Sequence, residues 1–306
     1  MLLFALRRIL GLVPVVLIVL TGSFFLAKLL PGGPFDRDKE VPVEVRRNLE
    51  AKYHLDQPAW RQYLFYLSDL ARGDLGPSTK YKDRSVGEIV AQTFPVTLEL
   101  ALFAMLLSLV TGIGAGLWAA LRQNRWQDHT AMSLALLGLS IPNFVLGPVL
   151  ILVFSIALQL FPPARWGGLS HLILPGITLS AIYSATLARM TRAGMLEVLQ
   201  QDYIRTARAK GLPERLVVLR HALRAGLLPV VTYAGPALAG LFTGSLVVEQ
   251  IFGVPGMGPF FVEAATNRDV GLALGVVLVD AVFLLAANLL VDLAYGFLDP
   301  RIGLGA

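Results

Sequence analysis

Few residues of this chain combine the types and the spacing that chemistry requires. The segment Gly112–Gly116 has the alternating glycines of a nucleotide loop, but a dinucleotide site needs a strand before such glycines and a helix after them. Here the glycines lie inside one long apolar run, so they predict close packing between helices. Two further pairs predict the same contact: Gly240 with Gly244, and Gly271 with Gly275.

Patterns for catalysis and for metal binding are missing as well. No segment matches Gly-x-x-x-x-Gly-Lys-Ser/Thr, so the chain has no P-loop for ATP. It has no cysteine, which excludes disulfides, thiolate metal sites and cysteine nucleophiles. No pair of carboxylates and no Ser/His/Asp group falls at a common depth in the membrane. The histidines are scattered along the chain: His54, His129, His171 and His221. We therefore expect no catalytic, cofactor-binding or metal-binding residue, and no enzymatic activity.

The composition indicates a membrane protein. Hydrophobic residues make up 55% of the chain and charged residues only 15%, whereas soluble domains are about one quarter charged. The formal net charge is +5, which membrane proteins reach through Lys and Arg in their cytoplasmic loops. We therefore expect a membrane location and no nucleic-acid partner.

Apolar runs long enough to cross a bilayer as a helix predict an all-α, polytopic protein with six transmembrane helices. The predicted spans are Ile9–Leu30, Pro95–Leu121, Thr130–Leu160, His171–Arg192, Leu228–Phe252 and Gly271–Tyr295. Pro95 and Pro229 suit a first helical turn, where the missing N–H costs nothing. Pro142 and Pro148 lie inside the third span and should kink it.

The distribution of basic residues predicts the orientation and the organisation. The first run is too long for a signal peptide and has no Ala-x-Ala cleavage site, so it is expected to be a retained helix. Basic residues gather in the segments that are inside if the N-terminus is inside, which places both termini in the cytoplasm. The predicted parts are a first helix (1–30), a periplasmic helical segment (31–94) and a five-helix core (95–306) with a cytoplasmic loop at 193–227.

The outer segment 31–94 is expected to fold rather than to be disordered. Pro42 opens a helical pattern, and Asp56 can cap another helix that starts near Pro58. Ser85 and Glu88 have the spacing of a capping box before an apolar run. Two interpretations stay open: a small helical cap on the membrane domain, or a docking surface for an external partner.

Two carboxylates lie inside predicted spans. Glu99 is near the start of the second span and Asp280 is within the sixth. An intramembrane carboxylate is costly and faces a polar interior by default. Asp280 is the good candidate for a proton relay, but a lone carboxylate at a helix–helix contact is an equally ordinary explanation.

The most informative segment is the cytoplasmic loop that follows the fourth span. Asp202 can cap a short helix that starts at Tyr203, and Gly211 can end it in the left-handed conformation. Pro213 can open the next helix, where leucines form an apolar stripe: Leu212, Leu216, Leu219 and Leu223. The helix is basic and has small residues that let another surface approach. It could lie on anionic lipid or insert into a groove of a partner protein.

This loop resembles a known family. Tyr203–Gly211, His221–Arg224 and Leu228–Pro229 are similar to the loop, often beginning Glu-Ala-Ala, of binding-protein-dependent ABC importer permeases. Arg205-Thr206-Ala207 stands at that start, a form typical of the peptide and nickel branch. Further segments resemble this branch: Ala51–Leu55, Gly73–Ser78, Phe94–Thr97, Ser140–Phe144, Gly253–Gly258, Asn267–Asp269 and Asp299–Arg301. Lys80–Asp83 and the chain length favour the oligopeptide permeases within it.

The resemblance implies the type I ABC importer permease fold, an inner-membrane location and alternating access driven by partner proteins. The implied partners are a second homologous permease subunit, two cytoplasmic ABC ATPase subunits and a periplasmic peptide-binding protein. The expected ATPase-coupling residues are Tyr203, Arg205, Thr206, Ala207, Arg208, Ala209, Lys210 and Gly211.

A second candidate region joins two spans at the outer mouth. It is rich in glycine and proline, which favour turns, and it is expected either to gate the pore or to contact the binding protein, with a passive turn as the alternative. Its residues are Pro255, Gly256, Met257, Gly258 and Phe260. Alternative functions are a dipeptide or nickel-chelate ABC permease, a proton-coupled secondary transporter and a non-transporting membrane scaffold.

Overall fold

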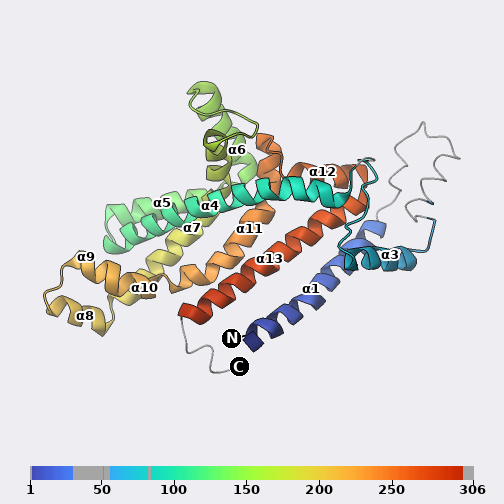
Figure 1. Cartoon of the computed structure of the whole chain (residues 1–306). Coiled ribbons are helices and arrows are strands. Elements are labelled where there is room, and N and C mark those ends of the chain that lie inside the picture. Colours follow the sequence, from blue (N-terminus) through green and yellow to red (C-terminus); the bar gives the residue numbers. More distant parts are fainter. Residues whose placement is uncertain (1, 30–50, 52–55, 82–83, 299–306) are drawn as a thin grey trace. The chain divides into compact units, whose positions relative to one another are not determined.

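The computed structural model describes residues 2–29, 51, 56–81 and 84–298. The described chain forms two compact units, which are considered separately: residues 97–254 with 286–306, and residues 2–96 with 255–285. The helical pattern expected from Pro42 lies outside the described residues. Within the described residues the elements are helices, shown in Figure 1, with one isolated β-bridge between Pro77 and Ser85.

The unit built on residues 97–254 holds most of the helices. It contains most of α4 (Val86–Leu121), then α5 (Trp126–Ser140), α6 (Asn143–Leu150), the π-helical η1 (Ile151–Ala157), α7 (Leu169–Leu199), α8 (Asp202–Ala209), α9 (Glu214–Leu216), the π-helical η2 (Val217–Ala222), α10 (Leu223–Gly226) and α11 (Leu228–Phe252). Helix α7 contacts α5, α6, α10 and α11, so it is the central helix of this unit.

The other unit holds α1 (Leu2–Leu29), α3 (Ala59–Ala71), the start of α4, α12 (Met257–Asn267) and most of α13 (Val270–Leu298). The expected capping box is present at the start of α4. The Ser85 amide donates to Glu88 Oε2 at 3.1 Å, and the Glu88 amide donates to Ser85 Oγ at 3.1 Å. Asp56 does not cap α3, because the amides of Arg61 and Gln62 bond the Pro58 carbonyl oxygen instead.

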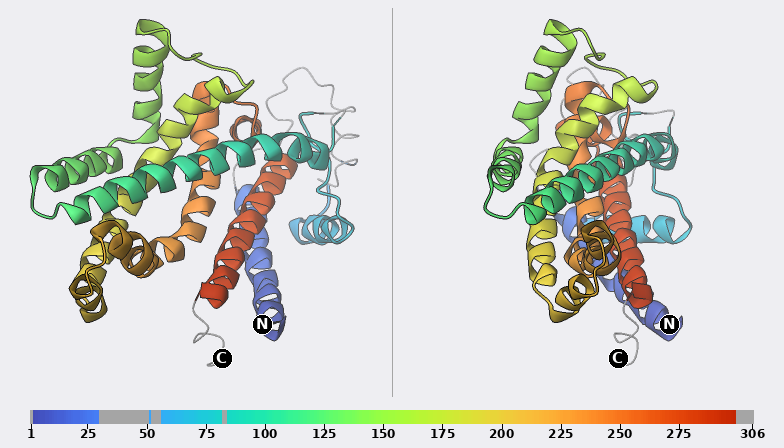
Figure 2. Two further views of the ribbon diagram at one scale, coloured as in Figure 1. Left: turned by 60° about the vertical axis from the view of Figure 1, so that its left-hand side comes forward. Right: turned by 90° about the vertical axis from the view of Figure 1, so that its left-hand side faces the viewer.

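The predicted spans agree with the helices. Among the described residues five helices are long and apolar enough to cross a membrane, and a bent pair makes a sixth if it counts as one span. That pair, α5 with α6 and η1, bends by 105° (Figure 2). The bend falls at Ile141 and Pro142, as expected, whereas Pro148 lies inside α6 without ending it.

One proline prediction is wrong and another is confirmed. Pro95 is not in a first turn, because α4 begins nine residues earlier at Val86, where the capping box satisfies its first amides. Helix α4 therefore continues through a proline in its interior. Pro229 does occupy the first turn of α11.

The glycine pattern in α4 marks a close contact with α7. A Cβ added at Gly112 would lie 2.7 Å from Leu187 Cβ, and one at Gly116 would lie 2.6 Å from Thr191 Cβ and would also overlap the Ala188 carbonyl oxygen. The predicted packing is confirmed here, because only a residue without Cβ permits this approach. Gly240 is equally close to Tyr183, whereas Gly244 has only an ordinary contact with Leu179.

The close packing predicted for the remaining glycine pair, Gly271 and Gly275, is confirmed in the other unit. A Cβ at Gly271 would lie 2.7 Å from the Pro77 carbonyl oxygen, and one at Gly275 would overlap Val86. These contacts hold the start of α13 against the outer segment and the first turn of α4.

We predict that Gly116→Val destabilises the packed helices by about 1–3 kcal/mol, the usual cost of forcing extra volume into a packed interface. Gly114→Val is the matched control, because nothing lies within 4 Å of a Cβ added there. Thermal unfolding of the purified protein in detergent measures both. An equal midpoint for the two variants would show that the α4–α7 contact is not tight.

Candidate functional site

The short helix α8 stands at the end of the long helix α7. Figure 1 shows α8 and α9 grouped beyond the end of α7 and beside α10. Helix α8 begins at Asp202, one residue earlier than expected, and it has no side-chain cap. Asp202 is therefore not the capping residue, and its carboxylate instead faces Arg205 at 3.4 Å. Helix α7 also runs seven residues past the expected end at Arg192, so the predicted loop 193–227 is largely helical.

One face of α8 is fixed to the core by apolar side chains. Ile204 is 0% exposed and Ala207 is 6% exposed. They belong to a cluster, called here the α8 cluster, whose other buried members are Ala120, Met195, Val217, Val218 and Ala222. The sequence analysis did not single out Ile204, and Ala207, expected to let a partner approach, packs inward. Their three-residue spacing, which puts both on one helix face, was the available signal.

The leucine stripe predicted for the next helix is partly wrong. Leu216 and Leu219 are exposed, whereas Val217 and Val218 are buried in the α8 cluster. The reason is that residues 217–222 form a π-helix, whose wider turn shifts which side chains face the core. An α-helical period therefore selects the wrong residues here.

The opposite face of α8 is exposed and basic. Tyr203, Arg205, Thr206 and Lys210 are all exposed. Arg208 makes two hydrogen bonds to Glu214, from Nε to Oε2 at 3.0 Å and from Nη2 to Oε1 at 2.7 Å. These bonds raise the pKa of Arg208 and lower the pKa of the Glu214 carboxyl. The pair joins α8 to α9 across the turn, and the sequence analysis did not identify Glu214.

The turn after α8 has the geometry expected of Gly211. Its φ is +78°, in the left-handed region that favours glycine, and nothing lies within 4 Å of a Cβ built there. The Gly211 amide donates to the Arg208 carbonyl oxygen at 2.9 Å, which closes the helix end. The requirement for glycine is therefore conformational and not steric.

A pocket of about 670 Å³ opens beside α8. It is lined by the end of α4, the α4–α5 turn, the end of α7 and the α8–α9 pair: Ala120, Leu121, Arg122, Gln123, Arg125, Leu196, Leu199, Gln200, Arg208 and Glu214. Nearby, Arg192 Nε lies 2.6 Å from Asp128 Oδ1 and Arg192 Nη2 lies 2.7 Å from Asp128 Oδ2, with Asp128 2% exposed. This ion pair, which the sequence analysis missed, joins α5 to α7.

The second candidate region follows α11. Gly253 ends that helix with φ of +61°. Pro255 is exposed and Phe260 is half-buried, whereas Gly256, Met257 and Gly258 are buried. The buried residues begin α12, so a partner that approached this region would meet Pro255 and the face of Phe260 before it met Met257.

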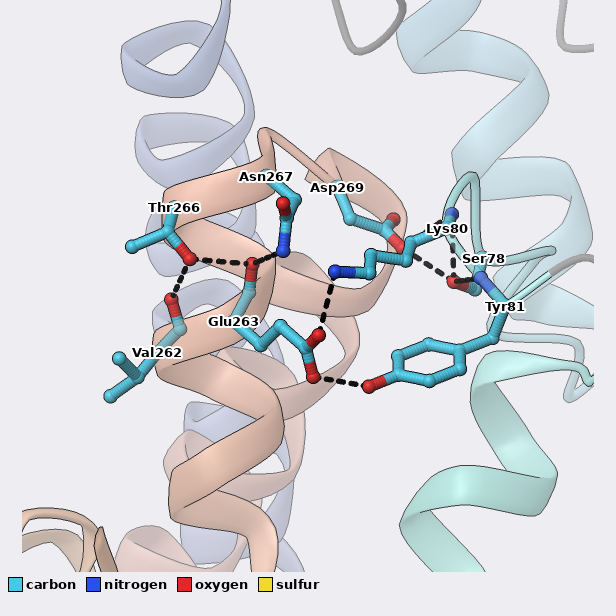
Figure 3. Close-up of polar contacts among 8 residues, drawn as sticks. All are labelled: Ser78, Lys80, Tyr81, Val262, Glu263, Thr266, Asn267 and Asp269. Atoms are coloured by element: carbon cyan, nitrogen blue, oxygen red, sulfur yellow. Dashed lines mark hydrogen bonds and ion pairs between the residues drawn. The ribbon is translucent and has the colours of Figure 1, made fainter. Parts of the chain in front are cut away.

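The outer segment holds α12 through a cluster that we call the outer latch: Ser78, Lys80, Tyr81, Glu263 and Asp269 (Figure 3). Glu263 accepts a hydrogen bond from the Tyr81 hydroxyl and faces Lys80 Nζ at 2.7 Å. Ser78 Oγ donates to Asp269 Oδ2 at 2.5 Å, and both residues are buried. In the sequence, Lys80, Tyr81 and Asp269 contributed only to the resemblance to the permease family. No sequence pattern singled out Glu263.

The latch shifts the ionisation of its members. Hydrogen bonds from Lys80 and Tyr81 lower the pKa of the Glu263 carboxyl. Burial, and then the hydrogen bond to Glu263, raise the pKa of Tyr81 to about 12. Phe260 packs on the Tyr81 ring at a centroid distance of 5.6 Å, so the same tyrosine contacts both the latch and the second candidate region.

The intramembrane carboxylates lie on separate helices. Glu99 is exposed on α4, and Asp280 is half-buried on α13. A third, Glu249 on α11, is 0% exposed and accepts a hydrogen bond from Ser245 Oγ at 3.0 Å. The sequence analysis overlooked Glu249, which lies three residues before Phe252 at the end of the fifth predicted span.

Comparison with known proteins decides the family. Residues 112–304 match the family described as binding-protein-dependent transport system inner membrane component, a stretch that includes α8 and the region after α11. The chain belongs to this family. It is a multi-pass permease of the inner membrane, and α8 lies within its family-defining part.

Individual relatives agree over the full length. The oligopeptide transport system permease OppB of Escherichia coli K12 is 48% identical over 304 residues, which cover 99% of each chain. OppB of Haemophilus influenzae is 46% identical over 304 residues, and the dipeptide permease DppB of Bacillus subtilis 168 is 44% identical over 301 residues, with 98–99% of each chain covered. A chain in the crystal structure of an amino acid ABC transporter with histidines shares the fold, with TM-score 0.53, 16% identity, 67% of this chain and 92% of that one.

The geometry of this inner membrane component at Gly211 gives a ranked prediction. Gly211→Ala should cost about 1–2 kcal/mol at the helix end because of the left-handed φ, and Gly211→Val should cost more because of its branched Cβ. Gly211→Asn should cost least, since Asn adopts this conformation readily. Hydrogen exchange of the α8 amides should rise in the order Asn, Ala, Val. An inverted order would mean that α8 does not end in this turn.

The outer latch gives a prediction about pH. Because the folded pKa of Glu263 is lowered, its contribution to stability is present above the ordinary value of 4.5 and is lost as pH falls through the folded pKa. Wild type and Glu263→Gln should therefore differ in unfolding midpoint at pH 7 and converge as the pH drops below that value. A difference that is constant with pH would rule out this role for the carboxylate.

Proposed function

We propose that this chain is the membrane subunit of an ATP-driven oligopeptide importer, and that α8 is the element that receives motion from a cytoplasmic ATPase. The observation that carries the proposal is that one face of α8 is buried against the core and the opposite face is exposed. Ile204 and Ala207 fix it to the end of α7, while Tyr203, Arg205 and Thr206 are exposed. A helix attached in this way can transmit a push to α7, the central helix of its unit.

The proposed docking face consists of the exposed coupling residues, with Arg208 and Gly211 holding the shape of the helix end. Ala207 takes part from the buried side, by seating α8 on the core. Arg205 and Arg208 are bonded to Asp202 and Glu214 within the chain. A partner groove would thus meet an ordered surface, which lowers the entropy lost on binding.

The proposed assembly follows from the family. Permeases named as binding-protein-dependent need a substrate-binding protein outside and an energy source inside, and this chain has no P-loop of its own. We infer a second, homologous permease subunit, two cytoplasmic ABC ATPase subunits and a periplasmic peptide-binding protein. From the basic residues of the short loops we also infer that both termini lie in the cytoplasm.

Region 255–260 is proposed as the periplasmic gate or as the contact for the binding protein. Pro255 and Phe260 offer the accessible surface, and Met257 is buried at the start of α12. The outer latch joins α12 to residues 78–81, so a partner that displaces one of these segments would also move the other. Oligopeptides are the proposed substrate because OppB is similar over the whole chain.

We predict that this chain co-purifies with two ABC ATPase subunits and a homologous permease, and that the assembly takes up oligopeptides in proteoliposomes only with ATP and a peptide-binding protein. The chain alone should not hydrolyse ATP. Competition by penta- and dipeptides would separate an oligopeptide from a dipeptide importer. Uptake that follows a proton gradient without ATPase subunits would instead indicate a secondary transporter.

A further inference from the structure

Helix α3 has an apolar face that the rest of the described chain leaves uncovered. Trp60 is 55% exposed and Leu64 is 56% exposed, and no residue of α3 is buried. These two side chains lie four residues apart and so share one face of the helix. Arg61 and Ser68 are also exposed and lie on the same side of the helix, whereas Gln62 and Asp69, on the opposite side, are only half-exposed. A helix with this pattern needs an apolar environment along one side only.

Specific contacts fix α3 against the C-terminal part of α1, as Figure 1 shows. Lys28 Nζ donates to Gln62 Oε1 at 2.5 Å, and the hydroxyls of Thr21 and Tyr63 are 2.5 Å apart. The Phe24 ring packs against Tyr63, with a centroid distance of 5.2 Å. Polar and aromatic contacts therefore set both the position and the rotation of α3 on α1.

These contacts also set the depth of α3 relative to a bilayer. The apolar stretch of α1 runs from Gly11 to Leu29, and Lys28 is the charge at its end. Phe24 is one turn inside that end, about 6 Å along the helix axis. Because Gln62 and Tyr63 of α3 contact Lys28 and Phe24, α3 lies beside the last turn of this apolar stretch. Interfacial helices bury their apolar face by about 5–10 Å.

The exposed surface of α1 continues towards α3. Leu26 is 66% exposed and Leu29 is 78% exposed, as expected of side chains that face lipid. Phe25, 39% exposed, packs on the Tyr63 ring of α3 at 5.6 Å. An apolar environment that covers the end of α1 therefore reaches α3 as well.

We propose that α3 is an interfacial helix whose Trp60–Leu64 face lies in the headgroup–acyl boundary of a phospholipid bilayer. Trp60 has the residue type enriched at this level, and the Arg61 guanidinium lies 5.1 Å from its ring centroid. The helix thereby anchors the outer segment to the lipid surface. The bilayer face concerned is the outer one under the proposed orientation, but the contact with lipid does not depend on that assignment.

This chain has no cysteine, so each variant carries a single labelling site on it. Leu64→Cys and, on the opposite side of α3, the control Asp69→Cys are labelled before the chain is assembled into the complete transporter in phospholipid nanodiscs. Accessibility to oxygen, which concentrates in lipid, is compared with accessibility to a water-soluble nickel chelate. We expect the oxygen-to-nickel ratio at position 64 to exceed that at position 69 by several-fold. A ratio at position 64 equal to or below the control overturns the proposal, as does low accessibility to both reagents, which means a protein partner covers the face.

A second measurement needs no label. Trp118→Phe, Trp126→Phe and Trp166→Phe together leave Trp60 as the sole tryptophan. Lipids brominated near the carboxyl end of the acyl chain should quench its fluorescence more strongly than lipids brominated near the methyl end. Absence of quenching by either lipid overturns the proposal even if a spin label disturbs position 64.

Discussion

The close approach of α4 to α7 is the contact on which the membrane core depends. Inside lipid, helices gain little from the hydrophobic effect, since the acyl chains are as apolar as the side chains, so association rests on packing and interhelical polar contacts. Gly112 and Gly116 remove the Cβ atoms that would keep the two backbones apart. Helix α7 in turn contacts α5, α6, α10 and α11, so its placement sets theirs.

The α8 cluster extends this core beyond the membrane span. Helix α7 continues to Leu199, and Met195 on it packs with Ile204 of α8 and Val217 of η2. The coupling element is therefore not a loose loop but a continuation of the central helix. Its exposed face is shaped by the Arg208–Glu214 bonds and by the left-handed turn at Gly211. A rigid path of this kind suits a subunit whose proposed task is to convert a partner's motion into a change of access.

The second unit is organised by polar contacts instead. Lys80, Tyr81 and Glu263 join the outer segment to α12, and Lys28, Gln62, Thr21 and Tyr63 join α1 to α3. Hydrogen bonds and ion pairs are directional, so they fix orientation where small apolar contacts would allow sliding. Both sets of contacts tie segments that are distant in sequence.

The amino-acid sequence by itself determined where the long apolar helices lie, the capping box at Ser85 and Glu88, the break near Pro142 and the left-handed end at Gly211. Each of these depends on a local property: hydrophobic length, cap spacing, or the φ that a single residue permits. It also identified the family, because the residues of the α8 segment are contiguous.

Only the tertiary structure decided which face of α8 is exposed, the pairing of Asp128 with Arg192 and the latch at Glu263. Partners distant in sequence carry no local signal. In η2, Val217 and Val218 face the core, whereas the expected Leu216 and Leu219 are exposed. The sequence could not predict this because an α-helical period does not anticipate the wider turn of a π-helix.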